Sequence, residues 1–206
     1  MQKWATDFGK EYTNRNPHNG QEMDQLYLQQ FGLKRSQLNT EFLGDLSRDI
    51  RILEVGSNVG TQLQMLQDMG FKNLYGVELQ SYAVELSKKL TKDIQIIQGS
   101  AQDLPFKDGF FDLVFTSGVL IHINPTDLPA VLAEMLRVTR RWVWGFEYFA
   151  EKHEEIPYRN HSNLMWKGDF CQLFLDRDRN LKTLKRKKVP YLNSTNQDEM
   201  YLLARA

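Results

Sequence analysis

Short apolar runs alternate with amphipathic stretches from residue 51 onward, and this alternation predicts the architecture of the chain. In the amphipathic stretches apolar residues recur every three or four positions, which is typical of helices packed on one side. The pattern predicts strands over 51–55, 73–77, 94–97, 111–116 and 142–147, and helices over 60–69, 81–90 and 126–138. Elements in that order indicate an α/β fold with a mostly parallel sheet and helices on both faces.

The N-terminal part has a different pattern. Residues 1–22 are polar and contain Asn-Pro and Asn-Gly breaks, and helices are predicted only after them, over 23–31 and 36–46. Ser36 has the side chain of an N-cap for the second helix. We therefore expect residues 1–48 to form a helical lid or collar, and residues 49–206 to form one sheet domain.

An apolar strand runs directly into a glycine-bearing turn between Arg51 and Thr61. Gly56 allows the sharp turn, and Gly60 allows a ligand or the next helix to approach where a Cβ would collide. Glu78 ends the next strand, where a carboxylate can accept hydrogen bonds from both ribose hydroxyls. The glycine spacing differs from the Gly-x-Gly-x-x-Gly turn that holds a pyrophosphate. The two features predict a nucleoside site without phosphates, although a plain strand, turn and helix with an exposed glutamate would share the pattern.

Ligands of parallel sheets bind beyond the carboxyl ends of the strands. This rule directs attention to the residues that follow the predicted strands, which are 56–60, 78–80, 99–103, 117–122 and 147–148. Asp112, near the start of its strand, is expected to fix that strand by local hydrogen bonds rather than to react. Trp142 and Trp144 are two positions apart, so both rings are expected to pack on one face of the sheet.

Charge indicates the class of partner. Lysine plus arginine equal aspartate plus glutamate at 26 each, so the chain has no net charge to attract nucleic acid or an anionic membrane. The basic run from Lys182 to Lys188 alternates with apolar residues and fits a solvated strand at the sheet edge. We therefore expect a small-molecule substrate, with neither nucleic acid nor membrane as a partner.

Cysteine and histidine usage predicts neither a disulfide nor a metal. The single Cys171 excludes an intramolecular disulfide, and its position in a predicted helix favours a buried, inert thiol. The sequence has no apolar signal-peptide core and no run of about 20 apolar residues, so a soluble protein of the reducing cytosol is expected. The four histidines lack the spacing of a metal site, so no metal is expected; they are His18, His122, His153 and His161.

The segment from Gly99 to Pro125, in which an apolar strand leads to Ser117 and His122, completes a set of motifs that resembles the class I S-adenosylmethionine-dependent methyltransferases. The resemblance implies a Rossmann-like sheet with S-adenosylmethionine as cofactor. It implies that the glycine turn holds the methionine moiety, that Glu78 holds the ribose, and that residues after the third strand touch the adenine. The residues implied to bind the cofactor are Tyr12, Glu54, Gly56, Ser57, Gly60, Glu78, Leu79, Ser100, Ala101, Gln102 and Ser117.

A narrower resemblance covers most of the chain. The segments 8–16, 118–125, 147–148, 156–161 and 167–170 are similar to the methylases associated with pseudaminic acid biosynthesis, which are bacterial proteins of surface-polysaccharide pathways. It implies methylation of an oxygen or nitrogen of a sugar, a nucleotide sugar or a nonulosonic-acid precursor. Tyrosine rings suit sugars, and an arginine can bind a carboxylate or phosphate through two hydrogen bonds. The residues expected to contact this substrate are Arg15, Tyr158, Arg159 and His161.

Methyl transfer is an in-line displacement, so the protein mainly has to position the nucleophile and exclude water. A base is needed only where the nucleophile must lose a proton. His122 is the first candidate, because imidazole is partly unprotonated at neutral pH, although it could also be a packing residue. Glu147 is the second and needs an upward pKa shift, and Tyr148 follows it. A lid over the cofactor is expected from Tyr12, Arg15 and Asn16.

Two other functions share these motifs. One is a methyltransferase that acts on a different small molecule, and the other is a binding protein that retains S-adenosylmethionine without turnover. The cofactor motifs and the polar residues after the fourth and fifth strands favour turnover.

Overall fold

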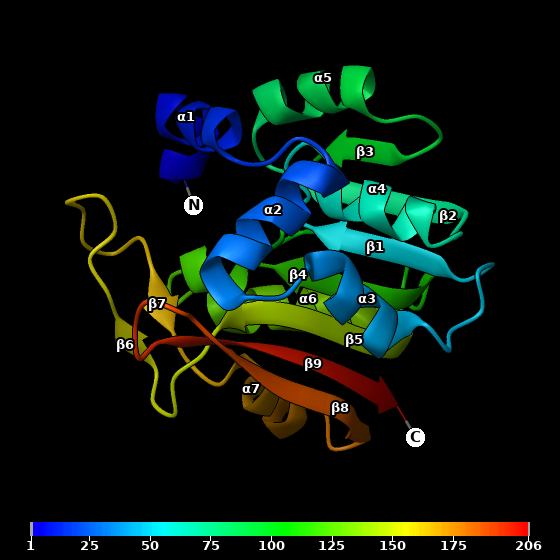
Figure 1. The fold of residues 1–206 in the computed structure, drawn as a ribbon. Helices are drawn as coiled ribbons and strands as arrows, with labels where there is room; N and C mark the ends of the chain where they lie inside the picture. Colours follow the sequence, from blue (N-terminus) through cyan, green and yellow to red (C-terminus); the bar gives the residue numbers. More distant parts are fainter. Residues whose placement is uncertain (1, 206) are drawn as a thin grey trace.

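The apolar runs form the centre of a seven-stranded sheet in the computed structural model, which describes residues 2–205 (Figure 1). The strands lie in the order β3-β2-β1-β4-β5-β9-β8. Strands β1 to β5 run parallel, whereas β9 is antiparallel to both β5 and β8. This mostly parallel sheet confirms the predicted fold class. The strands are β1 (Arg51–Val55), β2 (Asn73–Glu78), β3 (Gln95–Gln98), β4 (Phe111–Ser117), β5 (Thr139–Tyr148), β8 (Leu181–Pro190) and β9 (Gln197–Arg205).

The central strands are buried because helices cover both of their faces. Leu53 of β1 and Val114 of β4 lie beside each other in the register, and both are fully buried. Unbroken apolar runs of this kind are expected of parallel strands. The basic run 182–188 falls in β8 at the edge of the sheet, where its side chains reach solvent, as predicted.

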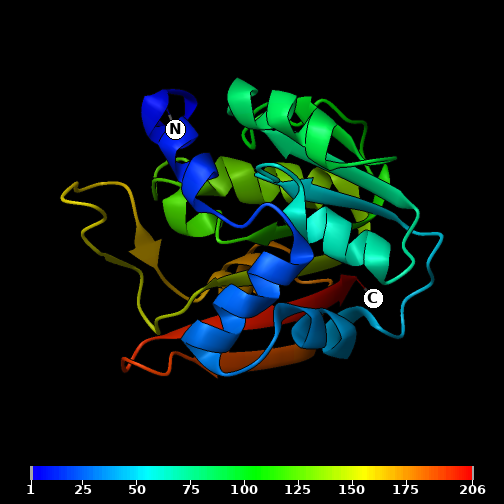
Figure 2. The same cartoon turned by 45° about the horizontal axis from the view of Figure 1, so that its top comes forward.

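Helices form a layer on each face of the sheet (Figure 2). One hydrophobic cluster joins α2, α3 and α4 to one face through Leu38, Leu63 and Phe115. A second cluster joins α6 and α7 to the other face through Val131 and Phe174. Because α2 and α3 share a core with the sheet, most of the predicted collar is packed on the sheet. The helices are α1 (Asp7–Arg15), α2 (Gly20–Phe31), α3 (Arg35–Leu43), α4 (Thr61–Asp68), α5 (Ser81–Leu90), α6 (Leu128–Val138) and α7 (Phe170–Arg177), with 3-10 turns η1 (Gln2–Ala5) and η2 (Leu120–His122).

Local predictions were mostly confirmed. Trp142 and Trp144 belong to the same hydrophobic cluster and therefore pack on one face. Asp112 accepts a hydrogen bond of 2.8 Å from the backbone N–H of Arg51 and pairs with Arg140, which fixes the start of β4. Each of these side chains serves the sheet rather than a ligand.

The prediction of an N-cap at Ser36 is wrong. Helix α3 begins one residue earlier, at Arg35, and its first turn is held by Gln37, whose side-chain oxygen accepts from the backbone N–H of Lys34 (2.9 Å). Ser36 Oγ instead donates to Asp24 Oδ2 of α2 (2.6 Å). A contact between two helices thus takes the hydroxyl that sequence spacing assigns to a cap.

The hydrophobic pattern does not predict α1, yet an aromatic cluster stabilises it. Phe8 and Tyr12 lie four residues apart on one face of α1, and each ring packs edge-on against Trp4 of η1 with centroids 5.2 Å apart. The helix lies near α5, at the carboxyl ends of the parallel strands (Figure 1). It thereby covers the edge of the sheet at which ligands bind.

A small second sheet holds a loop against α1. Strands β6 (Glu154–Glu155) and β7 (Trp166–Lys167) pair antiparallel and close the base of loop 156–165. Tyr158 of this loop packs near Trp4, with ring centroids 6.2 Å apart. In the described residues, no helix combines the length and apolar character needed to cross a bilayer.

Candidate active site

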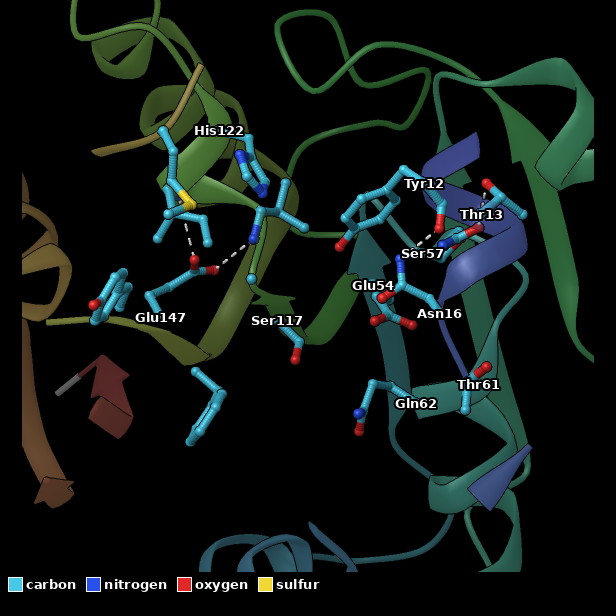
Figure 3. Close-up of a pocket in the computed structure, with 18 of the residues that line it drawn as sticks. Tyr12, Thr13, Asn16, Glu54, Ser57, Thr61, Gln62, Ser117, His122 and Glu147 are labelled. Carbon is cyan, nitrogen blue, oxygen red and sulfur yellow. Dashed lines mark hydrogen bonds between the residues drawn. The ribbon is translucent and has the colours of Figure 1, made fainter. Parts of the chain in front are cut away.

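A cavity of about 540 Å³ opens at the carboxyl ends of β1, β2, β4 and β5 (Figure 3). Helices α1 and α2 and the connection between β8 and β9 supply its other walls. The volume falls in the range of small-molecule sites, and the position is the one expected of ligands on parallel sheets. The cavity therefore defines the candidate site.

The turn after β1 is shaped by glycine. Gly56 has φ +76°, and a Cβ added there would lie 2.7 Å from Val119 Cγ2, so the loop after β4 approaches where only glycine fits. The backbone N–H groups of Gly56 and Ser57 both donate to Val77 O of β2 (2.8 and 3.1 Å). Gly60 does not line the cavity. Its missing Cβ instead makes room for the side chain of Ile96 in β3.

Glu78 ends β2 with its carboxylate at the cavity wall. Its Oε2 accepts from the backbone N–H of Asn58 (2.8 Å) and its Oε1 from that of Gln80 (2.7 Å). Burial raises the pKa of this carboxyl, while the backbone hydrogen bonds oppose the shift. Each oxygen keeps a lone pair, so the carboxylate can receive two further hydroxyl donors.

Three buried polar side chains beside this turn have atoms without a hydrogen-bond partner among residues 2–205: Oε2 of Glu54, Oγ of Ser57, and both amide atoms of Gln62. Burial raises the pKa of Glu54 well above its usual value. Figure 3 shows Gln62, from the first turn of α4, pointing into the cavity below Glu54. Because buried polar groups normally have partners, this set fits a ligand that carries a cation and hydrogen-bonding groups.

Hydrogen bonds tie helix α1 and its N-cap to the residues that follow β1 and β2. Thr13 Oγ1 donates to Asn58 Oδ1 (2.9 Å), and Gln80 Nε2 donates to the backbone oxygen of Thr6 (2.8 Å). Tyr12 and Asn16 of the predicted lid line the cavity, and the backbone oxygen of Tyr12 accepts from Asn16 Nδ2 (2.8 Å). The structure thus brings α1 over the cavity, beside the turn that follows β1.

His122 of η2 lines the cavity in an aromatic surrounding that includes Tyr12 of α1 (ring centroids 6.1 Å apart). Its Nδ1 lies 2.8 Å from the backbone oxygen of Leu164, and its ring centroid lies 4.4 Å from that of Trp4. A carbonyl only accepts, so this contact assigns the proton to Nδ1 and leaves the lone pair of Nε2 free. Burial lowers the pKa of His122 to about 4, so the ring is neutral at pH 7 and a weak base.

Glu147 gains the upward shift that a carboxylate base needs. Glu147 lies near the carboxyl end of β5 and lines the cavity. Its carboxylate accepts hydrogen bonds from the backbone N–H groups of Val119 (3.2 Å) and Ile121 (3.4 Å). Burial raises the pKa of Glu147 to about 7, against the effect of these hydrogen bonds. At neutral pH Glu147 is therefore better matched to proton transfer than His122, the reverse of the expected order.

The sequence did not indicate a second carboxyl group in the part of the cavity lined by Glu147 and Tyr148. Asp198 of β9 lies opposite Tyr148 of β5 in the antiparallel register, is buried, and accepts from the hydroxyl of Tyr191 (3.1 Å). Burial raises the pKa of Asp198 to about 7. Tyr27 of α2 lines the same part of the cavity. No local motif marks these residues, and only the pairing of β5 with β9 brings Asp198 to the site.

Most of the predicted site residues converge on the cavity. Those that line it are Tyr12, Asn16, Glu54, Gly56, Ser57, Glu78, Leu79, Ala101, Ser117, His122, Glu147, Tyr148 and Tyr158. Gly99 also lines it, whereas Ser100 and Gln102 do not, because Ser100 Oγ accepts from the backbone N–H of Gln102 (3.2 Å) within its own turn.

Three predicted substrate residues lie outside the cavity lining. Arg15 is 3.8 Å from Glu11 on α1, and Arg159 and His161 are exposed on loop 156–165. Their contact with substrate stays a prediction.

One further cluster of potential ligands lies in the layer of α7. Asp169, Cys171 and Glu199 bring ligand atoms within 4.8 Å of one another. Arg186 forms ion pairs with both carboxylates, at 2.7 Å from Asp169 and 2.8 Å from Glu199, so their negative charges are already paired with a guanidinium. Cys171 lies in α7 as predicted, and burial raises the pKa of its thiol to about 12. The cluster is a buried ion-pair network.

Comparisons with known proteins agree with this geometry. Residues 53–142 match the family described as a methyltransferase domain. A demethylmenaquinone methyltransferase from Renibacterium salmoninarum is 34% identical over 90 residues, which are 44% of this chain and 37% of that protein. The chain therefore spans little more than a third of the length of this curated relative.

Solved structures extend the likeness to nearly the whole chain. The PH0226 protein from Pyrococcus horikoshii OT3 superposes with a TM-score of 0.71 at 18% identity, covering 95% of this chain and 99% of that one. The 1,6-didemethyltoxoflavin-N1-methyltransferase from Burkholderia thailandensis, solved with bound S-adenosylhomocysteine, gives 0.64 at 15% identity over 83% and 76% of the two chains. At such identities the likeness concerns the fold. The chain has the class I methyltransferase fold, and its residues 53–142 match a methyltransferase domain.

Proposed function

We propose that the protein is an S-adenosylmethionine-dependent methyltransferase acting on a small molecule. The observation that carries the proposal is one cavity whose lining joins the turn after β1 and the end of β2 to the ends of β4 and β5. Glu54, Ser57 and Glu78 line one end, and Glu147 and Tyr148 line the other. A cofactor and an acceptor can therefore meet in one enclosed space, which methyl transfer requires.

The nucleoside end suits the cofactor. The free lone pairs of Glu78 would receive the ribose hydroxyls, and the unpartnered Oε2 of Glu54 would receive the ammonium group of the methionine moiety. Ser57 and Gln62 supply the neighbouring hydrogen bonds, and Ala101 lies at the wall proposed for adenine. S-adenosylmethionine, when bound, supplies an electrophilic methyl group. The contributions of Gly60, Ser100 and Gln102 to this site would be indirect, through packing and turn geometry.

The other end suits proton transfer and orientation. Glu147, with a pKa of about 7, would accept a proton from the acceptor, and Nε2 of His122 would contact the same molecule. Tyr148 offers a ring face and a hydroxyl. Helix α1 covers the cavity through Thr13 and Tyr12 and would keep water from the reacting atoms.

We further propose that the acceptor is a sugar or a sugar precursor. Tyr148 and Tyr158 provide rings with hydroxyl groups in the cavity lining, while Arg15, Arg159 and His161 lie outside it on α1 and loop 156–165. The quinone acceptor named for the curated relative does not transfer, because that relative matches over only 90 residues, 37% of its length, and the methyltransferase domain match ends at residue 142, before Glu147, Tyr148 and Tyr158. The support for a sugar comes from the narrower sequence resemblance.

Transfer of a labelled methyl group tests this function. The protein is incubated with methyl-labelled S-adenosylmethionine and, separately, with monosaccharides, amino sugars, nucleotide sugars and a short-chain naphthoquinol. Label in a sugar supports the proposal, with loss of at least about 100-fold in rate for Glu147→Gln. Label in the quinol alone would overturn the sugar assignment, and tight cofactor binding without label in any acceptor would favour a non-catalytic binding protein.

A further inference from the structure

We propose that the acceptor carries an ammonium group and that Asp198 binds it within a cage formed by Tyr27, Tyr148 and Tyr191. This inference rests on the proposed function and names the class of acceptor. It assigns a specificity role to residues of α2 and of the C-terminal hairpin, β8–β9, which lie outside the region matched by the methyltransferase domain. The group that accepts the methyl lies elsewhere on the same molecule, toward Glu147.

The charges along the cavity wall favour a cation. Four carboxyl groups line it, those of Glu54, Glu78, Glu147 and Asp198, and within residues 2–205 no lysine or arginine does. The first two lie at the cofactor end. The other two remain at the acceptor end without a basic side chain in ion-pair contact in the described structure. Two cations near this end, Arg35 and Lys167, lie outside the cavity lining: Arg35 lowers the pKa of Asp198, and Lys167 Nζ lies 5.6 Å from the ring centroid of Tyr148. An anionic group inside the cavity would still face the two carboxyl groups, which costs free energy.

Asp198 has the geometry of a receptor rather than of a structural carboxyl. It is 8% exposed, and both of its oxygens contact one donor, the hydroxyl of Tyr191 (3.1 and 3.3 Å). A carboxylate has about four acceptor positions, so most of its capacity stays unused.

Aromatic rings surround this carboxyl. The rings of Tyr148 and Tyr191 have centroids 5.9 Å apart, and Tyr27 packs on Phe146 at 5.5 Å. All four line the cavity. Ring faces attract cations, and two of these rings already contact one, since Arg35 lies 5.4 Å from the ring centroid of Tyr27 and Lys167 5.6 Å from that of Tyr148. An ammonium group in the cavity would gain from the remaining ring faces and from Asp198. A neutral hydroxyl would gain only a hydrogen bond.

Arg35 lies behind the cage and does not fill it. Its guanidinium is fully buried, stacks on Phe146 (4.7 Å) and Trp144 (5.3 Å), and donates to the hydroxyls of Tyr27 (2.7 Å) and Ser117 (3.1 Å). It is not part of the cavity lining. The guanidinium therefore orients Tyr27 and Ser117, and its positive charge lowers the pKa of Asp198. The face of Asp198 toward the cavity stays open to a ligand.

The test uses choline and its neutral isostere 3,3-dimethylbutan-1-ol, titrated into the full chain by calorimetry with and without saturating S-adenosylhomocysteine. We expect choline to bind at least tenfold more tightly than the isostere. Asp198→Asn should weaken choline binding at least tenfold and leave the affinity for S-adenosylhomocysteine unchanged. Asp45→Asn, which removes a carboxylate with 91% side-chain exposure, should change neither.

Equal affinity for the two probes, no choline binding, or an unchanged Asp198→Asn variant would each overturn the cage. Failure of the cofactor to bind would overturn the proposed function instead, and the titration without S-adenosylhomocysteine would still decide on the cage. If Asp198→Asn does not fold, Tyr148→Leu replaces it, with a severalfold loss for choline and none for the isostere.

Discussion

Thr13 of α1 donates a hydrogen bond of 2.9 Å to the side-chain oxygen of Asn58, in the turn that follows β1. Thr13 is 2% exposed, and Asn58 adopts a left-handed φ of +49° while its backbone N–H donates to Glu78. One short chain of contacts therefore joins the lid, the glycine turn and the proposed ribose acceptor. Through these contacts the position of α1 depends on the shape of the turn after β1.

Removing that contact should weaken cofactor binding. Thr13→Val keeps the shape of the side chain but removes the donor, at a cost of about 1 kcal/mol, or about fivefold in the dissociation constant of S-adenosylhomocysteine. Thr40→Val is the matched control, because Thr40 is exposed on α3, donates from Oγ1 to Ser36 O and does not line the cavity. Calorimetric titration of both variants measures the effect. Equal affinities would show that the lid is not coupled to the turn.

Two glycines of left-handed conformation should differ in their sensitivity to alanine. Gly56 (φ +76°) has Val119 2.7 Å from the position of an added Cβ, whereas Gly118 (φ +66°) has open space around that position. Gly118→Ala should therefore cost about 1 kcal/mol through backbone strain alone, and Gly56→Ala about 2–4 kcal/mol because overpacking is added. Urea unfolding of both variants checks the order. A Gly118→Ala variant as unstable as Gly56→Ala would contradict it.

The rate of methyl transfer should rise with pH through about 7. Burial raises the pKa of Glu147 to about 7, and a base must be unprotonated, so kcat/KM increases as pH rises through that value and then levels off. Asp198 titrates in the same range and interacts with Glu147, so the wild-type profile belongs to the pair. Glu147→Gln should lower the plateau and remove most of this limb, while Asp198→Asn should keep it. A full limb in Glu147→Gln would exclude that carboxyl as the base.

His122 should make the fold sensitive to acid. Its pKa is lowered by burial from 6.5 to about 4, so the unfolded chain binds a proton first as pH falls. The contribution is fully present above pH 6.5 and decreases toward pH 4, with about 2 kcal/mol lost between pH 7 and 5. His122→Asn keeps a donor toward Leu164 O but does not titrate. Urea unfolding at pH 7, 6 and 5 should give a shallower decline for the variant, and parallel declines would contradict the burial of this imidazole.

The sequence predicts the parallel half of the molecule well because its signals are local. Periodicity places β1 to β5 and the helices between them within about three residues of their observed bounds. For the same reason the spacing from Glu54 to Ser57 and the position of Glu78 predict residues that line the cavity, whereas Gly60 does not line it. Such features depend on neighbours in the chain, which a single sequence contains.

The acceptor end could not be predicted in the same way. Asp198 and Tyr191 reach the cavity only because β9 inserts between β5 and β8, and no residue pattern specifies that pairing. Helix α1 depends on contacts of Trp4 with residues on other elements, including His122. Arg159 and His161 are exposed on loop 156–165 and do not line the cavity, so their expected contact with substrate stays a prediction.

The most direct test of the central claim is calorimetric titration of the protein with S-adenosylmethionine and S-adenosylhomocysteine, beside a Glu78→Ala variant. Glu85→Ala is the control, since Glu85 is exposed on α5, pairs with Lys88 and does not line the cavity. We predict binding by the wild type and by Glu85→Ala, weakened at least about tenfold, or about 1.4 kcal/mol, in Glu78→Ala. Absence of binding by the wild type, or equal binding by Glu78→Ala, would contradict the assignment of this cavity to the cofactor.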